Sequence, residues 1–444
     1  YSFAKYLADD RQTVIDQRKR DELDNKTFTT SINYTEPLGQ LWTATFGYAF
    51  QTNNASTLNQ SFNKDPNTGV YSVLDEAVLN DFDFKSIKSS ANTGLNFKNE
   101  KWTINTSANV DFEDVKRYYK NINNTLKRSQ HAVNPRASIG YNLAKNKILT
   151  FLYRGRTIQP DLAQIEPLKQ NADQLVNYLD NPNLSAGFDN RYIMRFNSFR
   201  PLKERSFFLA GSVTQQIKSI AAKVRYYPGT GKRDISYVNM DKQNWSFNLI
   251  GNYQMPILRK IGLNMSMGTE ATYSTRYSYL STEKVESELN KTEQVSIRGN
   301  LGFSRYKANQ LDLSLSLNPG MSVLNSSLQK ELNSKVFEFS SDAYIVYYLP
   351  IDFELSFNIN QSYSGATKTL PSYHIFNVNG YLSKKLLRSK ALETQIYVND
   401  LLNKNNGIER SQNGSSFIQT RNDVVRRYIM LKLIYNFTTI KNGG

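Results

Sequence analysis

Few residues in this chain could hold a metal ion or act in nucleophilic catalysis. There is no cysteine, so neither a disulfide framework nor a thiolate metal site can form. The only two histidines, His131 and His374, each lack a second histidine nearby in the sequence. Nothing resembles a Ser/His/Asp triad or a pair of catalytic carboxylates. The sequence therefore predicts a protein that is not an enzyme and carries neither a metal nor a cofactor.

One polar stretch is rich in carboxylates and admits two interpretations. Oxygen ligands suit calcium, so the stretch could form a calcium or cationic-ligand site. It could equally be a solvated loop, which is the interpretation that we prefer. The residues concerned are Asp161, Glu166, Asp173, Asp180 and Asp189.

A second cluster joins cations to aromatic rings. Residues 116–120 place Arg117 beside Tyr118 and Tyr119. Such a group could stack on a ligand through cation–π contacts, or it could lie in an aromatic girdle at a membrane surface. We prefer the girdle. The contacts to any ligand stay unknown at this stage.

The formal charge of +16 indicates either an anionic partner or a position beside anionic groups. Nucleic acid is one candidate, because a basic balance is its usual footprint. The lysines and arginines are, however, spread along the chain, without an arginine-rich arm. A basic rim or lumen that meets anionic lipid or an anionic solute explains them better, and we predict no nucleic-acid partner.

The elements that carry these side chains show a period of two. Trp102, Ile104, Thr106, Ala108, Val110 and Phe112 alternate with polar residues, and this pattern recurs in residues 245–254, 311–318 and 351–360. A period of two places one set of side chains on each face of a strand. These runs have the length of a tilted strand that crosses hydrocarbon. A soluble β-sandwich also alternates, so this pattern alone leaves both architectures open.

The connections between strands separate the two architectures. Eight are short, and long polar stretches lie between them, such as residues 52–85, 156–190, 216–243 and 401–423. Outer-membrane barrels have tight periplasmic turns and long extracellular loops, whereas a sandwich does not sort its loops in this way. The short connections are residues 36–40, 98–100, 144–146, 201–205, 256–260, 306–310, 349–350 and 384–390.

Aromatic residues and hydropathy agree with a membrane barrel. No apolar run is long enough for a transmembrane helix, and the mean hydropathy of −0.55 is compatible with strands that face lipid on one side only. Tyr, Phe and Trp make up 12% of the chain. Trp42, Trp102 and Trp245 stand at strand ends and are predicted to form interfacial girdles.

The strand count predicts a piece of a larger barrel. Eight short turns make sixteen strands, and a last strand follows at residues 427–437. Single-chain bacterial barrels have even strand numbers, so seventeen predicts a chain cut at its N-terminus. We expect residues 1–25 to be an extracellular loop segment, residues 26–437 the barrel and residues 438–444 a periplasmic tail. In the last strand, one membrane-facing row resembles a C-terminal insertion signal: Ile429, Leu431, Leu433, Tyr435 and Phe437.

Three segments resemble TonB-dependent receptors, in a composition similar to barrel proteins of Bacteroidetes. They are the hairpin that opens Asn134-Pro-Arg and continues through residues 148–160, the segment Asp180-Asn-Pro-Asn-Leu184 and the step Val398-Asn-Asp-Leu-Leu-Asn403. After Leu184, Ser185-Ala-Gly replaces the usual Lys-Pro-Glu, so that match is partial. The likeness runs from about residue 26 to residue 437.

The resemblance implies a transmembrane antiparallel up-and-down β-barrel of about 22 strands around a plug. This chain would supply the last seventeen strands, and the plug and its TonB-binding box would be missing. It also implies import of a scarce small solute of unknown type, with energy from TonB. The implied partners are outer-membrane lipid, the barrel insertion machinery and TonB. Two other classes stay open: a passive porin or barrel adhesin without energy coupling, and a soluble β-sheet binding protein.

Overall fold

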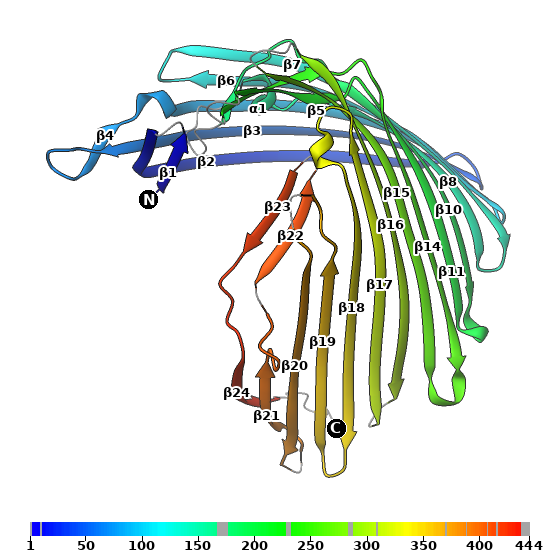
Figure 1. Cartoon of the computed structure of the whole chain (residues 1–444). Coiled ribbons are helices and arrows are strands. Elements are labelled where there is room, and N and C mark those ends of the chain that lie inside the picture. The colour runs from blue at the N-terminus through cyan, green and yellow to red at the C-terminus, as the bar shows by residue number, and fades with distance from the viewer. Residues whose placement is uncertain are drawn as a thin grey trace.

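The computed structural model describes residues 2–8, 11–166, 176–227, 232–282, 287–307, 310–368, 371–387, 389–405, 407–413 and 416–436. Within these ranges most strands form one long antiparallel wall that bends into a trough (Figure 1), and β22 and β23 form a separate two-stranded sheet. Each wall strand pairs with the wall strand that follows it, as expected for an up-and-down wall. No helix in the described ranges is long and apolar enough to cross a bilayer.

The strands of the wall follow one another without a crossover. They are β2 (Arg11–Pro37), β3 (Trp42–Lys64), β5 (Asn80–Lys98), β6 (Trp102–Tyr119), β7 (Asn124–Ala144), β8 (Lys147–Ile158), β10 (Gly187–Arg200), β11 (Arg205–Ile217), β14 (Asn244–Leu258), β15 (Leu263–Thr282), β16 (Glu288–Lys307), β17 (Leu311–Ser326), β18 (Ser334–Leu349), β19 (Phe353–Ser364), β20 (Tyr373–Leu386), β21 (Leu392–Asn399) and β24 (Tyr428–Tyr435).

This list confirms the predicted all-β class and gives seventeen wall strands among the described residues. All eight short turns are also confirmed, because they join β2–β3, β5–β6, β7–β8, β10–β11, β14–β15, β16–β17, β18–β19 and β20–β21. Several of these turns need a left-handed backbone. Gly39 and Gly262 have φ of 102° and 71°, which glycine adopts without a steric penalty.

The predicted long loops were wrong in one respect, because much of the stretches 52–85, 216–243 and 401–423 is itself β structure. β3 and β5 remain paired up to Asn59 and Asn80, within the stretch expected to be a loop. Both faces of a strand above the membrane meet water, so the alternation that marks a wall strand is lost there while backbone pairing continues. The remaining strands are β1 (Ser2–Ala8), β4 (Tyr71–Leu74), β9 (Val176–Tyr178), β12 (Ile220–Tyr227), β13 (Lys232–Asn239), β22 (Ile408–Asn413) and β23 (Ser416–Arg421).

Short helices complete the described elements. They are α1 (Leu162–Ile165), η1 (Glu76–Val78), η2 (Pro201–Lys203), η3 (Arg259–Ile261) and η4 (Lys330–Leu332). The connection between β6 and β7 is short too, at residues 120–123, because both strands are extended at this end.

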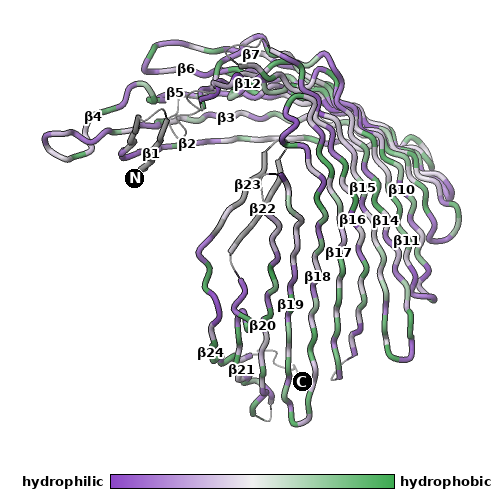
Figure 2. The backbone as a smooth tube through the Cα atoms, viewed as in Figure 1, coloured by the Kyte–Doolittle hydropathy of each residue, from purple (hydrophilic) through white to green (hydrophobic). Residues whose placement is uncertain are grey.

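The register sorts side chains into an apolar and a polar face. One row of directly paired residues is apolar throughout: Val213, Phe247, Tyr273, Val295 and Val323. The adjacent row is polar throughout: Ser212, Asn248, Thr272, Ser296 and Ser322. Hydrophobic and hydrophilic segments alternate along the wall strands in Figure 2.

The apolar face has the exposure expected of a surface that meets lipid. Phe247 and Ile396 are 44% and 50% exposed, although water would disfavour both. On the polar face, Ser356 and Ser383 are buried, as side chains crowd on the concave side of a curved sheet. We therefore call the apolar face the outer face and the polar face the inner face.

The two ends of the wall are not paired with each other. Among the described residues, β2 pairs with β1 and β3, and β24 pairs with β21 alone. The wall is thus an open trough (Figure 1). β2 is continuous from Arg11, so the strand begins before residue 26, the expected start of the barrel. Residues 438–444, the predicted tail, lie outside the described residues.

The last strand offers a direct test of the two faces. Leu433 pairs with Thr394 on the outer face, whereas Lys432 pairs with Gln395 on the inner face. We expect Leu433→Arg to lower the free energy of unfolding by about 2–4 kcal/mol, because the charge would enter hydrocarbon. Urea unfolding in detergent or lipid would measure the change.

Lys432→Ala is the matched control. The Lys432 ammonium lies 4.0 Å from the centre of the Tyr397 ring, so its removal should cost only about 0.5–1 kcal/mol. Equal losses for the two variants would contradict the assignment of faces.

Candidate functional site

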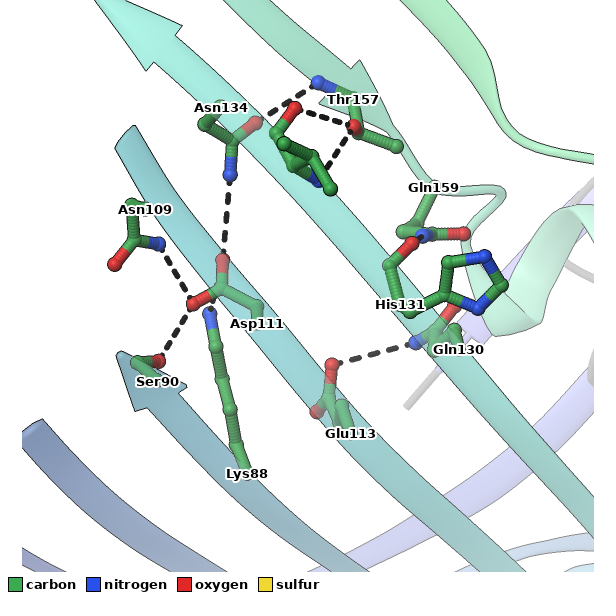
Figure 3. A network of polar contacts seen from close by, with 11 residues as sticks. Lys88, Ser90, Asn109, Asp111, Glu113, Gln130, His131, Asn134, Thr157 and Gln159 are labelled. Carbon is green, nitrogen blue, oxygen red and sulfur yellow. Dashed lines mark hydrogen bonds and ion pairs between the residues drawn. The ribbon is translucent and has the colours of Figure 1, made fainter. Parts of the chain in front are cut away.

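A recess of about 650 Å³ opens on the inner face where β5, β6, β7 and β8 run side by side. Polar side chains from consecutive strands line it, namely Lys88 from β5, Asp111 from β6 and Asn134 from β7, and Ser90 of β5 lies beside Asp111 (Figure 3). The register places these residues on the same side of the sheet, since alternate strand positions share a face. A volume of this size suits a small solute.

Asp111 is the centre of a hydrogen-bond network in this recess. Its Oδ1 accepts hydrogen bonds from Ser90 Oγ at 2.6 Å and from Asn109 Nδ2 at 2.8 Å (Figure 3). Its Oδ2 lies 3.4 Å from the Lys88 ammonium, and its side chain is 14% exposed. The charge of Asp111 is therefore already balanced within the wall.

The recess forms where the pairing of β7 with β8 changes character. From the pair Asn142–Ile148 the ladder is continuous up to the pair Arg136–Arg154. Beyond it, Pro135 has no N–H to donate, and the Asn134 side chain substitutes for the backbone by accepting a hydrogen bond from the Thr157 N–H at 2.9 Å. The Asn-Pro-Arg segment of the resemblance thus ends a ladder and lines the recess.

Residues 159–166 and 176–186, the described parts of the connection between β8 and β10, fold back over the wall. Ile165 of α1 and Leu184 are 2% and 3% exposed. Asn181 connects several parts of this cover: its N–H donates to Ile165 O at 2.9 Å and its Nδ2 donates to Tyr237 O at 2.8 Å. Arg128 of β7 donates to Leu184 O at 2.8 Å. The Asp-Asn-Pro-Asn-Leu segment therefore fastens the cover to the wall.

Arg117 lies beneath this cover and not in an outer girdle. It is 7% exposed, and its guanidinium lies 4.9 Å from the centre of the Phe82 ring. One Nη donates to the Tyr119 hydroxyl at 2.9 Å. Tyr118, one position along, belongs to the outer face and donates to Asn123. The cluster that the sequence placed in a girdle is thus divided between the two faces.

A second recess of about 580 Å³ adjoins the first, and the two share Arg156 and Gln159. The β12–β13 hairpin contributes to its lining. In that hairpin the Tyr227 hydroxyl donates to Asp234 at 2.6 Å, and this hydrogen bond raises the pKa of Tyr227. The hydroxyl is the donor in this pair.

The Val398–Asn403 step is a turn around a buried carboxylate. Asp400 is fully buried and accepts hydrogen bonds from the N–H groups of Lys404 at 2.9 Å and Asn405 at 3.1 Å. Its own N–H donates to Asn379 Oδ1 at 2.8 Å. The motif therefore ends β21 and shapes the connection that follows, which is a structural role.

The three tryptophans lie near the ends of wall strands, on the outer face. Trp42 and Trp102 adjoin short turns, and their rings lie 4.9 Å from Phe97 and 4.5 Å from Tyr141. Trp245 is at the opposite end, where its ring stacks on Phe247 at 6.3 Å. In the last strand, Ile429, Leu431, Leu433 and Tyr435 share the outer face. Phe437 lies outside the described residues.

The described carboxylates of the stretch 161–189 form no cluster of three with one another or with histidine. Asp161 precedes α1, and Asp189 lies 3.7 Å from Arg156. Asp173 falls outside the described residues. In the part of the chain that the structure describes, no group of three His, Cys, Asp or Glu residues could hold a metal ion.

Tight turns at one end, extended hairpins at the other and the two-faced strands between them define the wall of an outer-membrane β-barrel. The outer membrane protein beta-barrel family matches residues 2–322 and 288–435, and the chain belongs to this family. The protein is accordingly located in the outer membrane of a Gram-negative bacterium. This membership is consistent with the resemblance to TonB-dependent receptors.

Comparison with solved structures gives matches at low sequence identity. The ferric preacinetobactin receptor BauA from Acinetobacter baumannii is 12% identical, with a TM-score of 0.43, over 94% of this chain and 64% of that one. The ferripyoverdine receptor of Pseudomonas aeruginosa is 9% identical, with a TM-score of 0.41, over 96% of this chain and 67% of that one. The ferric yersiniabactin uptake receptor FyuA from Yersinia pestis is 9% identical, with a TM-score of 0.37, over 95% of this chain and 71% of that one. No curated protein matches the chain.

The Asp111 network predicts a cost for its removal. Asp111→Ala leaves Lys88 and Asn109 without their acceptor, and we expect a loss of about 1–2 kcal/mol of unfolding free energy. The exposed Asp114, which accepts a hydrogen bond from Ser129, is the control, and Asp114→Ala should cost no more than about 0.5 kcal/mol. Urea midpoints followed by gel mobility would measure both, and equal midpoints would argue against a structural role for the network.

Proposed function

We propose that this chain is the wall of a receptor that imports a scarce solute across the outer membrane with energy supplied through TonB. The observation that carries the proposal is the recess on the inner face, reached from the side of the extended hairpins. Family membership supports a barrel wall, and the Asn-Pro-Arg, Asn-Pro-Asn-Leu and Val-Asn-Asp-Leu-Leu-Asn segments support the receptor class.

The uptake proposal assigns distinct tasks to the parts of the molecule. The wall and its covering stretch would hold the solute on the inner face. A plug domain inside the barrel would transmit energy from TonB and prevent leakage through a lumen of this width. Additional strands would close the trough, because unpaired backbone groups at an open edge are unfavourable in hydrocarbon.

We also propose how the wall sits in the bilayer. Trp42 and Trp102 would lie at the periplasmic interface and Trp245 at the outer one, since indole rings favour the headgroup region. The row Ile429, Leu431, Leu433, Tyr435 and Phe437 would face lipid and present the final strand to the insertion machinery. The indole contacts and outer-face register described above support these positions.

A conductance measurement distinguishes coupled uptake from passive diffusion. The natural gene product, purified from outer membranes in detergent, should migrate faster before boiling than after it. Reconstituted in a planar bilayer, it should show no steady ion current, because a plug fills the lumen. A steady current would instead favour the passive porin, and recovery without detergent would favour a soluble sheet protein.

A further inference from the structure

Two arginines on neighbouring wall strands lie directly opposite each other at the edge of the recess. Arg136 of β7 pairs directly with Arg154 of β8, and Arg154 pairs with Arg191 of β10. All three side chains are exposed on the inner face. Neighbouring strands lie about 5 Å apart, so three positive charges form a short row across the sheet.

This arrangement is unfavourable for the wall by itself. Like charges directly opposite each other in a sheet repel. Among the described residues, no carboxylate lies within ion-pair distance of Arg136 or Arg154, whereas Arg156, two positions further, is 3.7 Å from Asp189. The row therefore contributes nothing evident to the stability of the strands that carry it.

Two carboxylates, Asp111 and Glu113, line the recess. Asp111 accepts hydrogen bonds from Ser90 and Asn109 and pairs with Lys88. Glu113 accepts a hydrogen bond from Gln130 at 3.3 Å. Asp111 is thus balanced by Lys88, whereas Glu113 keeps its negative charge; in the described part of the chain neither carboxylate lies within ion-pair distance of the Arg136 or Arg154 guanidinium group.

The lining of the recess has an excess of positive charge. Four cationic residues line it, namely Lys88, Arg136, Arg154 and Arg156, against the two carboxylates Asp111 and Glu113. The lining itself carries an excess of two positive charges, one of which Asp189 offsets at Arg156, in a concave volume of about 650 Å³ where low-dielectric walls concentrate the field. An anionic occupant would balance the remaining positive charge.

We propose that this recess binds a small solute with at least two anionic oxygen groups, carboxylate or phosphate, through Arg136 and Arg154. A guanidinium group offers two parallel N–H donors to such a group, so a facing pair can hold two of them at a fixed spacing. Asn134 and Thr157, which end the β7–β8 ladder above this pair, give the occupant room. The inference rests on the proposed uptake function, because it names the class of solute taken up.

Calorimetry on the detergent-purified natural gene product tests the inference with three probes. Tricarballylate represents a polycarboxylate, inorganic pyrophosphate represents a phosphate, and maltose is the uncharged control. We expect one or both anions to bind, more weakly as salt is raised because salt screens the charges. Arg136→Gln with Arg154→Gln should weaken binding at least tenfold.

A matched double variant controls for the loss of two charges. Arg200 and Arg205 also face each other across a ladder, but at the short-turn end of β10 and β11, outside the recess. Arg200→Gln with Arg205→Gln should leave binding unchanged. Heat-dependent mobility shows that each variant has folded.

The outcomes separate this inference from the uptake proposal. Binding of tricarballylate alone assigns a polycarboxylate, and binding of pyrophosphate alone assigns a phosphate compound. If neither anion binds better than maltose, or the Arg136/Arg154 variant binds as the unchanged protein does, the inference is overturned. A steady bilayer current would refute coupled uptake and would leave a positive binding result intact.

Discussion

The structure depends on one constraint: in hydrocarbon, each backbone N–H and C=O must find its partner within the protein. The continuous ladders from β2 to β24 meet this requirement along the wall. Because strand pairing then fixes which residues lie side by side, the alternation of side chains becomes a division of the whole wall into two faces. The row from Val213 to Val323 and the adjacent row from Ser212 to Ser322 are both consequences of that pairing.

The recess shows what happens where the constraint relaxes. At Pro135 the backbone has no N–H, and side chains of Asn134 and Thr157 take over the connection between β7 and β8. This exchange is tolerable on a wall whose inner face is polar, because side-chain amides and hydroxyls can form hydrogen bonds with the backbone N–H and C=O groups that the ladder does not pair. The chemistry of the recess, including the arginine row, is therefore a local departure from a regular sheet.

The wall could be predicted from the sequence because its signals are short-range. Turn residues such as Gly39 and the alternation around Trp102 determine strand ends and faces without knowledge of distant residues. The extended hairpins were missed, since strands with water on both sides lose the period of two, as in β3 beyond Thr52. Arg117 was misplaced because its position beneath α1 depends on a stretch far along the chain.

The arginine row had a signal in the sequence that went unused. Arg136 and Arg154 both stand within the hairpin segments that carried the resemblance, Arg136 in β7 and Arg154 in β8. The direct pairing of Arg136 with Arg154 depends on the register of β7 and β8, and a shift of one residue would abolish this pairing. Register in turn depends on the length of the turn at residues 145–146. The sequence alone therefore does not show which charged side chains lie opposite each other.

The paired extension of β3 and β5 has a consequence for the outside of the cell. A tilted strand needs only about 9–11 residues to cross hydrocarbon, and β3 has 23. More than half of that strand therefore stands clear of the lipid as a stiff arm, with residues 65–70 near its tip. An arm of this kind is free of the alternation that governs the wall, so its sequence can drift, accept insertions or carry an epitope while the membrane-embedded half stays unchanged.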